Sequence, residues 1–348
     1  MPHDTFLFDL APTLPTTRQI AMDVKRDGSA GLQGAVLRAD AARYREVRCR
    51  SALNRVEGMS FFRWTLNPYR GCTHGCHYCF ARRYHSQFEL DSGDDFASVI
   101  LVKANFVEVL RAELDRPSWK RDLVALGTAT DPYQPIEGHY RLTRRSLEAL
   151  CDARTPVSIV TKGPMAVRDR DILQGLSRRA RCTVHFSVPT VDEDAWRLLE
   201  PGTSHPLQRL RAVRTLTDAG IRAGVLIAPI VPGITSQPAK LERTIKAVAD
   251  HGAAFVGSAV LHLKDGTRSH FLNYLSREFP ALAPRYQRLY ASRAYVPSAY
   301  AAEVSDLVQL LQDRYGLSQR TREEGSEGDA SDEVKGQSSH RQAAFEYG

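Results

Sequence analysis

The sequence predicts an α/β protein built around a parallel β-sheet, and two observations carry this prediction. From about Phe61 to Leu263, short apolar or β-branched runs alternate with longer stretches that have helical spacing. A strand that is followed by a helical crossover and another strand pairs in parallel with that strand. About six such units fit a full or partial β/α barrel or a doubly wound sheet. Periodicity does not separate these two architectures.

Each expected strand is a run of apolar or β-branched residues bounded by turn residues. The expected strands are residues 62–66, 99–102, 123–127, 157–161, 183–188, 224–228 and 255–261. The expected helices lie between them and place apolar residues on one face. They are residues 106–114, 143–152, 167–179, 206–219 and 238–250.

The composition changes along the chain and suggests four regions. Residues 1–55 mix polar and Arg-rich stretches without a clear period, so we expect an N-terminal arm before a main domain at 56–265. Residues 266–316 are helical in pattern and predict a C-terminal helical cap. Residues 317–348 are polar and rich in Gly and Ser, which predicts a disordered tail.

Length and composition exclude several classes of protein. With 348 residues, 25% charged and 43% hydrophobic, the chain is neither collagen-like, wholly disordered nor a disulfide scaffold. No apolar stretch approaches the roughly 20 residues of a membrane-spanning helix. The N-terminus lacks a basic start followed by an apolar block. We therefore expect a soluble, cytoplasmic monomer that does not associate with membranes.

The net charge of +7 comes almost entirely from arginine, since only eight of the 47 basic residues are lysine. Codon bias is the ordinary explanation for such a composition. Arginine also recognises phosphate well, because its planar fork donates two parallel hydrogen bonds. Clusters at 82–83, 144–145, 178–181 and 209–214 leave nucleic acid open as a partner.

Three of the six cysteines fall in the segment GCTHGCHYCF, at Cys72, Cys76 and Cys79. On a helix this spacing would place three small buried side chains on one face. The turn residues that precede and interrupt the segment, among them Pro68 and Gly75, argue against a helix. The cysteines therefore point to a metal centre.

The kind of metal centre follows from the number of ligands. Structural zinc takes four ligands, and His74 or His77 could supply the fourth, so zinc stays open. Three closely spaced thiolates suit an iron–sulfur cluster better. A [4Fe–4S] cluster with three protein ligands keeps one iron free for a substrate or cofactor, which indicates chemistry at the cluster.

The C-x-x-x-C-x-x-C spacing, with Tyr78 before the last cysteine, resembles the motif of the radical S-adenosylmethionine (SAM) superfamily. The segment 52–82 is similar to the spore photoproduct lyase-like branch, and most closely to uncharacterised mycobacterial proteins of the Rv2578c type. Further similar blocks occur in the same order, and the resemblance spans about residues 45–310. These blocks are residues 127–137, 142–150, 160–173, 187–190, 200–210 and 218–235.

The resemblance implies a partial (β/α)6 barrel of the TIM-like, radical SAM type, with a [4Fe–4S] cluster on the loop after the first strand. In this superfamily SAM binds the open iron, and an electron from a flavodoxin- or ferredoxin-type donor cleaves it to a 5′-deoxyadenosyl radical. The radical then abstracts hydrogen from a substrate. Active sites of such barrels lie at the carboxyl ends of the strands, where several of the similar blocks fall.

The resemblance also implies roles for individual residues. Cys72, Cys76 and Cys79 would hold the cluster, and His74 and His77 would flank it. The other implied roles are contacts with SAM. The residues that match those positions are Tyr78, Thr128, Thr130, Asp131, Lys162, Ser187, Arg209 and Ala228, with Pro229 beside it.

Several of these residues have a simpler explanation that stays open. Tyr78 could be a packing aromatic, and Thr128, Thr130 and Asp131 could cap an ordinary loop. Lys162 follows a strand, where its charge would face the cavity and the SAM carboxylate or ribose. Arg209 could pair with the SAM carboxylate or with the neighbouring Glu200.

One departure from the family pattern limits the inference about the reaction. Spore photoproduct lyases carry a cysteine near the strand end at which this chain has Thr128, and that cysteine returns hydrogen to the product. Cys151 and Cys182 lie elsewhere in the sequence. Thymine-dimer lyase activity is therefore not expected, and Tyr69 or Tyr133 would be alternative hydrogen donors. No catalytic residue is assigned from the sequence.

The sequence thus predicts a radical SAM enzyme with an unidentified substrate, for which nucleic acid or a nucleotide is a candidate. A second hypothesis is a non-catalytic nucleic-acid-binding protein that a metal or cluster stabilises. A third is a scaffold that binds SAM without turnover. The polar residues at the strand ends favour the first hypothesis, because a binding module does not need them.

Overall fold

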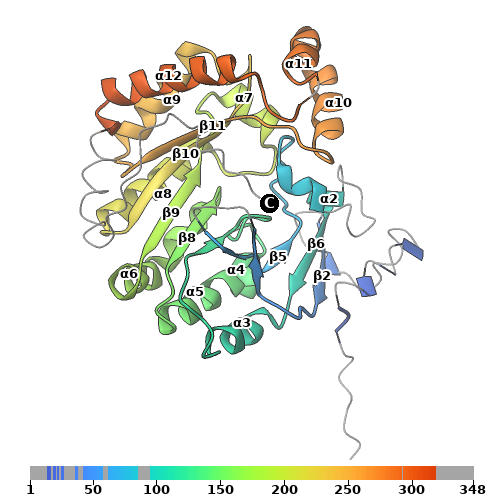
Figure 1. Cartoon of the computed structure of the whole chain (residues 1–348), viewed down its shortest axis with the longest axis vertical. Coiled ribbons are helices and arrows are strands. Elements are labelled where there is room, and N and C mark those ends of the chain that lie inside the picture. Colours follow the sequence, from blue (N-terminus) through green and yellow to red (C-terminus); the bar gives the residue numbers. More distant parts are fainter. Residues whose placement is uncertain are drawn as a thin grey trace, which may run out of the picture.

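The computed structural model describes residues 42–57, 62–84, 95–291 and 293–318, together with residues 14–16, 19–20, 22, 25–26 and 36–37. The described chain forms two β-sheets, with most of its helices packed against the larger one (Figure 1).

The larger sheet has seven strands in the order β11-β10-β9-β8-β7-β4-β3. Six of them are parallel, and β3 joins β4 in antiparallel register at one edge. The edge strands β3 and β11 do not pair, so the described sheet does not close. The structure therefore confirms a partial barrel with six parallel strands. The strands are β3 (Leu53–Arg55), β4 (Trp64–Leu66), β7 (Val124–Leu126), β8 (Val157–Thr161), β9 (Cys182–Ser187), β10 (Arg222–Ile230) and β11 (Val256–Val260).

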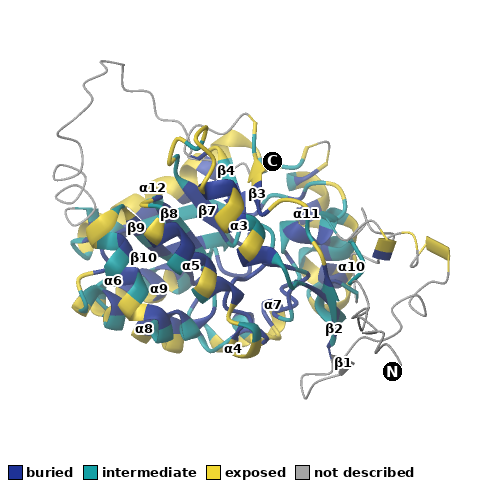
Figure 2. Cartoon of the chain, turned by 90° about the horizontal axis from the view of Figure 1, so that it is seen from below, coloured by how far each residue is buried: buried dark blue, intermediate teal, exposed yellow. Residues whose placement is uncertain are grey.

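Five helices cover the outer face of this sheet (Figure 1). They are α3 (Phe106–Leu114), α5 (Leu142–Asp152), α6 (Arg170–Arg179), α8 (Pro206–Asp218) and α9 (Pro238–Asp250). Their apolar faces and the outer strand side chains, such as Ile159 and Phe186, form the main hydrophobic core. The central strands β7 and β10 are accordingly mostly buried, whereas the edge strands β3 and β11 are more accessible (Figure 2).

The second sheet has four strands in the order β1-β2-β6-β5. The strands are β1 (Val36–Leu37), β2 (Arg43–Val47), β5 (Tyr69–Arg70) and β6 (Val99–Lys103). The sequence analysis placed 99–102 among the strands of the main sheet, and this placement is wrong. The run is a buried strand, but it pairs with β2 and β5. An apolar run predicts a strand without saying which sheet it joins.

The chain after the last barrel strand is helical, as expected. It contains α10 (Arg268–Glu278), η5 (Pro280–Leu282), α11 (Ala283–Leu289) and α12 (Ser298–Arg314). Helix α12 packs on α9 and β11, whereas α10 and α11 belong to a second hydrophobic cluster that also contains Cys76 and Tyr78. Shorter helices are η2 (Phe80–Tyr84), α2 (Asp95–Ser98), α4 (Glu137–Tyr140), η4 (Pro164–Asp169) and α7 (Glu193–Leu199).

The division of the chain into four regions stays a prediction. Strands β2 and β3 lie within residues 1–55, the stretch expected to be an N-terminal arm. The described end of that stretch is therefore part of the fold. Most of residues 1–41 and the predicted tail from residue 319 onward lie outside the described residues. Among the helices that the structure describes, none is long and apolar enough to cross a membrane.

Candidate functional site

A cavity of about 780 Å³ lies at the carboxyl ends of the parallel strands, between the sheet, the cysteine-bearing segment and helix α12. We refer to residues 71–79 as the cysteine loop. All but one of the site residues predicted from the sequence line this cavity. Those that line it are Cys72, Cys76, Tyr78, Cys79, Thr128, Thr130, Asp131, Lys162, Ser187 and Ala228.

The cysteine loop consists of turns and contains no helix, so the three cysteines are not a helical core stripe. Gly71 and Gly75 have φ angles of +80° and +61°, a region that favours glycine. Cys72 and Cys76 are buried and Cys79 is partly buried. The loop therefore presents three thiols to one side of the cavity.

Arg82 holds the cysteine loop from behind. Its side chain is buried and donates hydrogen bonds to the backbone carbonyls of Gly75 at 2.6 Å and Cys76 at 3.0 Å. Its guanidinium also lies 4.9 Å from the centre of the Phe96 ring. Arg82 was grouped with Arg83 as a basic surface for phosphate, and for Arg82 this is wrong, because the charge is used inside the fold.

A second loop, residues 200–204, lies directly against the cysteine loop. The Gly202 amide donates to the His74 carbonyl at 3.0 Å. A Cβ at Gly202 would lie 2.2 Å from the Thr73 carbonyl oxygen, so only glycine permits this approach. The His77 amide likewise bonds to the Leu199 carbonyl at 3.1 Å.

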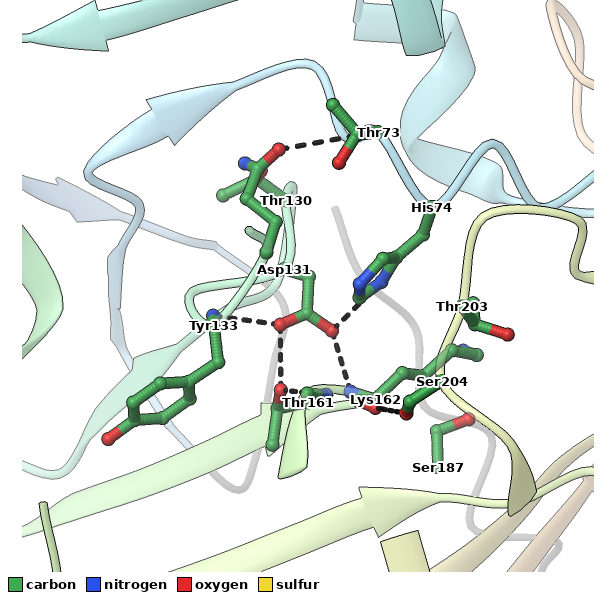
Figure 3. A network of polar contacts seen from close by, with 12 residues as sticks. Thr73, His74, Thr130, Asp131, Tyr133, Thr161, Lys162, Ser187, Thr203 and Ser204 are labelled. Carbon is green, nitrogen blue, oxygen red and sulfur yellow. Dashed lines mark hydrogen bonds and ion pairs between the residues drawn. The ribbon is translucent and has the colours of Figure 1, made fainter. Parts of the chain in front are cut away.

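Asp131 joins three strand-end loops (Figure 3). Its carboxylate accepts hydrogen bonds from the Thr161 hydroxyl at 2.6 Å and from the Lys162 and Tyr133 amides at 2.6 and 2.8 Å. The His74 ring lies 3.4 Å away. Burial raises the pKa of Asp131, but His74 and these donors outweigh it and lower the pKa to about 2. Asp131 lines the cavity while both of its oxygens are engaged by the protein.

Thr128 and Thr130, which precede Asp131, differ in how many hydrogen bonds their hydroxyl groups already form within the protein. Thr130 donates its hydroxyl to the Gly71 carbonyl at 2.6 Å and accepts from the Gln134 amide at 3.0 Å. Gln134 also accepts from the Thr73 amide at 3.2 Å. Thr128 accepts from the Asn67 amide at 3.1 Å, which leaves its hydroxyl proton available to the cavity.

Lys162 extends over the ring of Tyr78, with its ammonium 5.6 Å from the ring centre. The same ammonium lies 3.8 Å from a Glu200 carboxylate oxygen, which accepts a hydrogen bond from the Tyr78 hydroxyl. Burial lowers the pKa of Lys162, but Cys76 and Glu200 outweigh it and raise the pKa. The cavity thus holds a lysine that stays cationic beside the three thiols.

Arg209 is the predicted site residue that does not line the cavity. It is fully buried and forms an ion pair with Glu200 at 2.6 Å. Its guanidinium also donates to the carbonyls of Ser187 at 2.9 Å and Ser204 at 2.7 Å. Of the two partners that the sequence left open, the structure shows Glu200. Arg209 supports the site from behind.

Ser187 and Ala228 lie at the ends of two adjacent strands, β9 and β10. The Ser187 hydroxyl donates to the Ala228 carbonyl at 3.0 Å, and Ala228 precedes Pro229 through a cis peptide bond. Both residues and Pro229 line the cavity. They form its wall opposite the cysteine loop.

The two histidines of the cysteine loop face different surroundings. His74 is buried against Asp131; burial lowers its pKa, but Cys72 and Asp131 outweigh burial and raise it to about 10. His77 turns away, stacks on Tyr274 with ring centres 3.7 Å apart and lies 3.3 Å from a His270 nitrogen. Burial and the nearby Arg82 lower the pKa of His77 to about 4. His77 therefore connects the loop to α10.

The donor set can be compared with the two metal centres left open by the sequence. Within the described residues, no three His, Cys, Asp or Glu side chains are grouped to hold a metal ion. The three thiols line one side of the cavity, and three thiolates suit an iron–sulfur cluster, whose irons are separate ligand positions.

Some arginines of the other basic clusters form ion pairs with carboxylates of the protein. Arg144 pairs with Asp171 at 2.7 Å, and Arg145 pairs with Glu108 at 2.9 Å. The arginines of 178–181 are exposed, but they lie at the amino end of β9, away from the cavity. These clusters do not form a phosphate surface at the site.

The alternative hydrogen donors proposed from the sequence do not line the main cavity. The Tyr69 hydroxyl donates to Glu137 at 2.5 Å, and Tyr133 is buried. Several residues that shape the site were not singled out from the sequence: Arg82, Gln134 and Gly202. They lie inside or beside the similar blocks, but only their contacts reveal their roles.

A parallel partial barrel with a cysteine loop and a lysine at its carboxyl end defines a cofactor-dependent α/β enzyme. The chain belongs to the radical SAM superfamily, whose family model matches residues 66–246. Membership implies a [4Fe–4S] cluster and SAM as cofactors, and it makes the chain a radical SAM enzyme.

The comparisons also identify similar individual proteins. The uncharacterised protein Rv2578c of Mycobacterium tuberculosis is 39% identical over 280 residues, which cover 80% of this chain and 82% of that protein. A radical SAM Nalpha-GlyT isomerase of Pseudomonas phage M6 is 27% identical over 172 residues, 49% of this chain and 33% of that protein.

Among solved structures, spore photoproduct lyase has a similar fold. One variant of it has a TM-score of 0.61 at 14% identity, covering 87% of this chain and 92% of the other. Another, with bound AdoMet and a dinucleoside spore photoproduct, has a TM-score of 0.60 and covers 78% of each chain. At this identity the likeness concerns the fold.

Proposed function

We propose that this enzyme holds one [4Fe–4S] cluster on Cys72, Cys76 and Cys79, binds SAM in the main cavity and acts on a nucleotide-containing substrate. The observation that carries the proposal is that three of the six cysteines line the same cavity as Lys162. Cys151 and Cys182 are buried in the main core instead.

The residues present fit the cofactors. Thiols are the ligands that iron–sulfur clusters prefer, and three of them leave one iron for SAM. When bound, the cluster and SAM supply an electron and a 5′-deoxyadenosyl radical that abstracts hydrogen. We further propose an external flavodoxin- or ferredoxin-type electron donor, a monomer and a cytoplasmic location.

The cavity side chains divide into groups that would touch SAM and groups that position them. Lys162, Thr128 and Ser187 line the cavity and would meet the polar groups of SAM, whereas Tyr78 and Ala228 would meet its adenine. Asp131, Thr130 and Arg209 are already bonded to the protein. We assign them to positioning, since a carboxylate or guanidinium with satisfied partners gains little by exchanging them.

The substrate class is supported by one title among the similar proteins, since the solved lyase structures include one with a dinucleoside photoproduct. The reaction is not proposed to be that lyase reaction, because Thr128 stands near the position that the lyase cysteine has in the resemblance. Among the described residues, Cys72, Cys76 and Cys79 are the cysteines that line the cavity.

The test is anaerobic reconstitution with iron and sulfide, followed by dithionite and SAM. We expect about four irons per chain, an absorbance that bleaches on reduction, and release of 5′-deoxyadenosine and methionine. A protein that retains only zinc would contradict the proposal and favour the nucleic-acid-binding alternative. A cluster that never cleaves SAM would favour the non-catalytic scaffold.

A further inference from the structure

A second, smaller pocket of about 240 Å³ adjoins the main cavity. Thr128 and Ala81 line both spaces, so the pocket lies beside the proposed SAM site. Its walls come from β3, β4, β5 and β6, which means that both sheets contribute. Three of its lining residues are cationic: Arg55, Arg70 and Lys103.

Lys103 and Arg55 have donor capacity left for a ligand. The Lys103 ammonium donates to the Asn67 carbonyl at 2.7 Å, which uses one of its three protons. The Arg55 side chain is exposed, and it forms no hydrogen bond or ion pair with the described residues, since Arg55 pairs with Trp64 through the backbone alone. Arg70 is partly buried and donates to the Tyr84 carbonyl at 3.2 Å.

No carboxylate is among the described residues that line this pocket. Burial and the neighbouring Arg70 lower the pKa of Lys103 to about 8. Arg70 and Lys103 repel each other in this space, and a bound anion would reduce that repulsion. A bound anion would therefore be stabilised by the whole group, and phosphate suits arginine and lysine donors best.

Aromatic rings run from this pocket along the main cavity. Tyr84 lines the small pocket and lies edge-on to Phe80 at 6.4 Å. Phe80 lies 6.3 Å from His262, and His262 stacks on Tyr295 at 5.5 Å. Phe80, His262 and Tyr295 line the main cavity, and Tyr295 is 38% exposed. Such rings are surfaces on which nucleobases stack.

We infer that the small pocket is the phosphate subsite of the substrate, and that it and the aromatic row together receive one nucleotide unit. Arg55, Arg70 and Lys103 would hold the phosphate, and the rings would carry the base. The unit could be a free nucleotide or part of a nucleic acid strand, since both offer the same phosphate and base. This inference rests on the proposed function, whose substrate class it deepens.

The experiment measures binding to the unsubstituted, reconstituted protein in the presence of SAM. The probe is a short fluorescein-labelled single-stranded oligonucleotide, with a nucleoside monophosphate, the matching nucleoside and inorganic phosphate as competitors. We expect the monophosphate to compete at least tenfold better than the nucleoside. Stronger binding of the oligonucleotide than of the monophosphate would identify a nucleic acid strand as the source.

Variants separate the two parts of the subsite. Arg55→Gln removes an exposed charge whose side chain supports no other contact with the described residues, and we expect about tenfold weaker binding of oligonucleotide and of phosphate, since a charge-assisted hydrogen bond is lost. Tyr295→Ala should weaken nucleotide binding several-fold without changing phosphate binding. The matched control is Arg178→Gln, an exposed arginine at the far end of α6.

Two outcomes would overturn the inference: Arg55→Gln binding as the unsubstituted protein does, or Arg178→Gln losing as much affinity as Arg55→Gln. The second outcome would show unspecific attraction to a basic surface. Release of 5′-deoxyadenosine by the unsubstituted protein is measured in parallel. Cleavage without nucleotide binding would reject this subsite and leave the proposed function standing, whereas absence of cleavage would reject the proposed function itself.

Discussion

The Glu200 carboxylate accepts a hydrogen bond from the hydroxyl of Tyr78, so the loop after α7 is joined to the cysteine loop. Glu200 also pairs with Arg209 and lies near the Lys162 ammonium. Burial raises the pKa of Glu200, but Arg209 and Lys162 outweigh it and lower the pKa, which keeps the carboxylate charged. One buried acid thus contacts the Tyr78 hydroxyl and two cations, Lys162 and Arg209.

Replacing any one of Cys72, Cys76 or Cys79 with alanine should abolish both the cluster and SAM cleavage. Each thiol is proposed to hold one iron, and a cluster does not survive the loss of one of three ligands. Iron and sulfide content and 5′-deoxyadenosine release measure the two effects.

The control for these variants is Cys151→Ala, because Cys151 is buried in α5, away from the cavity. Its iron content and cleavage should match those of the unsubstituted protein. SAM cleavage that persists in Cys76→Ala would refute the assignment of the ligands.

Gly202→Ala should displace the cysteine loop. Its Cβ would lie 2.2 Å from the Thr73 carbonyl oxygen, and one of the two backbones has to move. Overpacking of this kind costs about 1–3 kcal/mol. We expect a lower melting temperature together with reduced iron incorporation on reconstitution.

The matched control is Gly138→Ala in α4, where the added Cβ would have its nearest contact with Met165 at an ordinary 3.6 Å. That variant should melt at or above the unsubstituted temperature, because alanine favours a helix over glycine. Equal melting and iron content of the two variants would contradict the close approach at Gly202.

Glu200→Gln should destabilise the fold strongly. It leaves the fully buried Arg209 guanidinium without its counter-charge, and breaking a buried pair from one side costs about 3–5 kcal/mol. The measurement is the free energy of unfolding from denaturant titration of the full chain. The control is Glu193→Gln, which removes the partner of Arg197 in an exposed ion pair. This variant should change the free energy of unfolding by less than about 1 kcal/mol. Similar losses in both variants would argue against a special role of Glu200.

Oligonucleotide affinity should fall as the pH rises through about 8. Burial and Arg70 lower the pKa of Lys103 to about 8, so Lys103 is cationic below that pH and neutral above it. A phosphodiester does not titrate in this range, and only the protonated lysine attracts it. The charged or titratable groups that act on Lys103 are Arg70 and Cys49, and burial raises the pKa of Cys49, which favours the neutral thiol.

The check is anisotropy of the labelled oligonucleotide from pH 6.5 to 9.5 with the unsubstituted protein and Lys103→Gln. The substituted protein should bind more weakly and lose the fall near pH 8. A fall of equal size in both proteins would place the titrating group elsewhere.

Local sequence patterns predicted most individual elements. The helices 106–114 and 238–250 and the strand 157–161 begin and end where the periodicity placed them. Periodicity succeeds here because each element packs one regular face on a single core. The three cysteines were found in the same way, since ligands on one short loop must be close in sequence.

What only the tertiary structure decided concerns residues that meet from distant parts of the chain. Arg82 belongs to a basic cluster in the sequence, and the sequence leaves Arg209 between the SAM carboxylate and Glu200. The burial of both depends on carbonyls and a carboxylate from other parts of the chain. Arg55, Arg70 and Lys103 come from β3, β5 and β6, which belong to two different sheets. The sequence pattern assigned β6 to the wrong one of these sheets. Cysteine spacing is a local property, whereas the environment of a charge depends on which strands pair, and that is settled by packing of the whole chain.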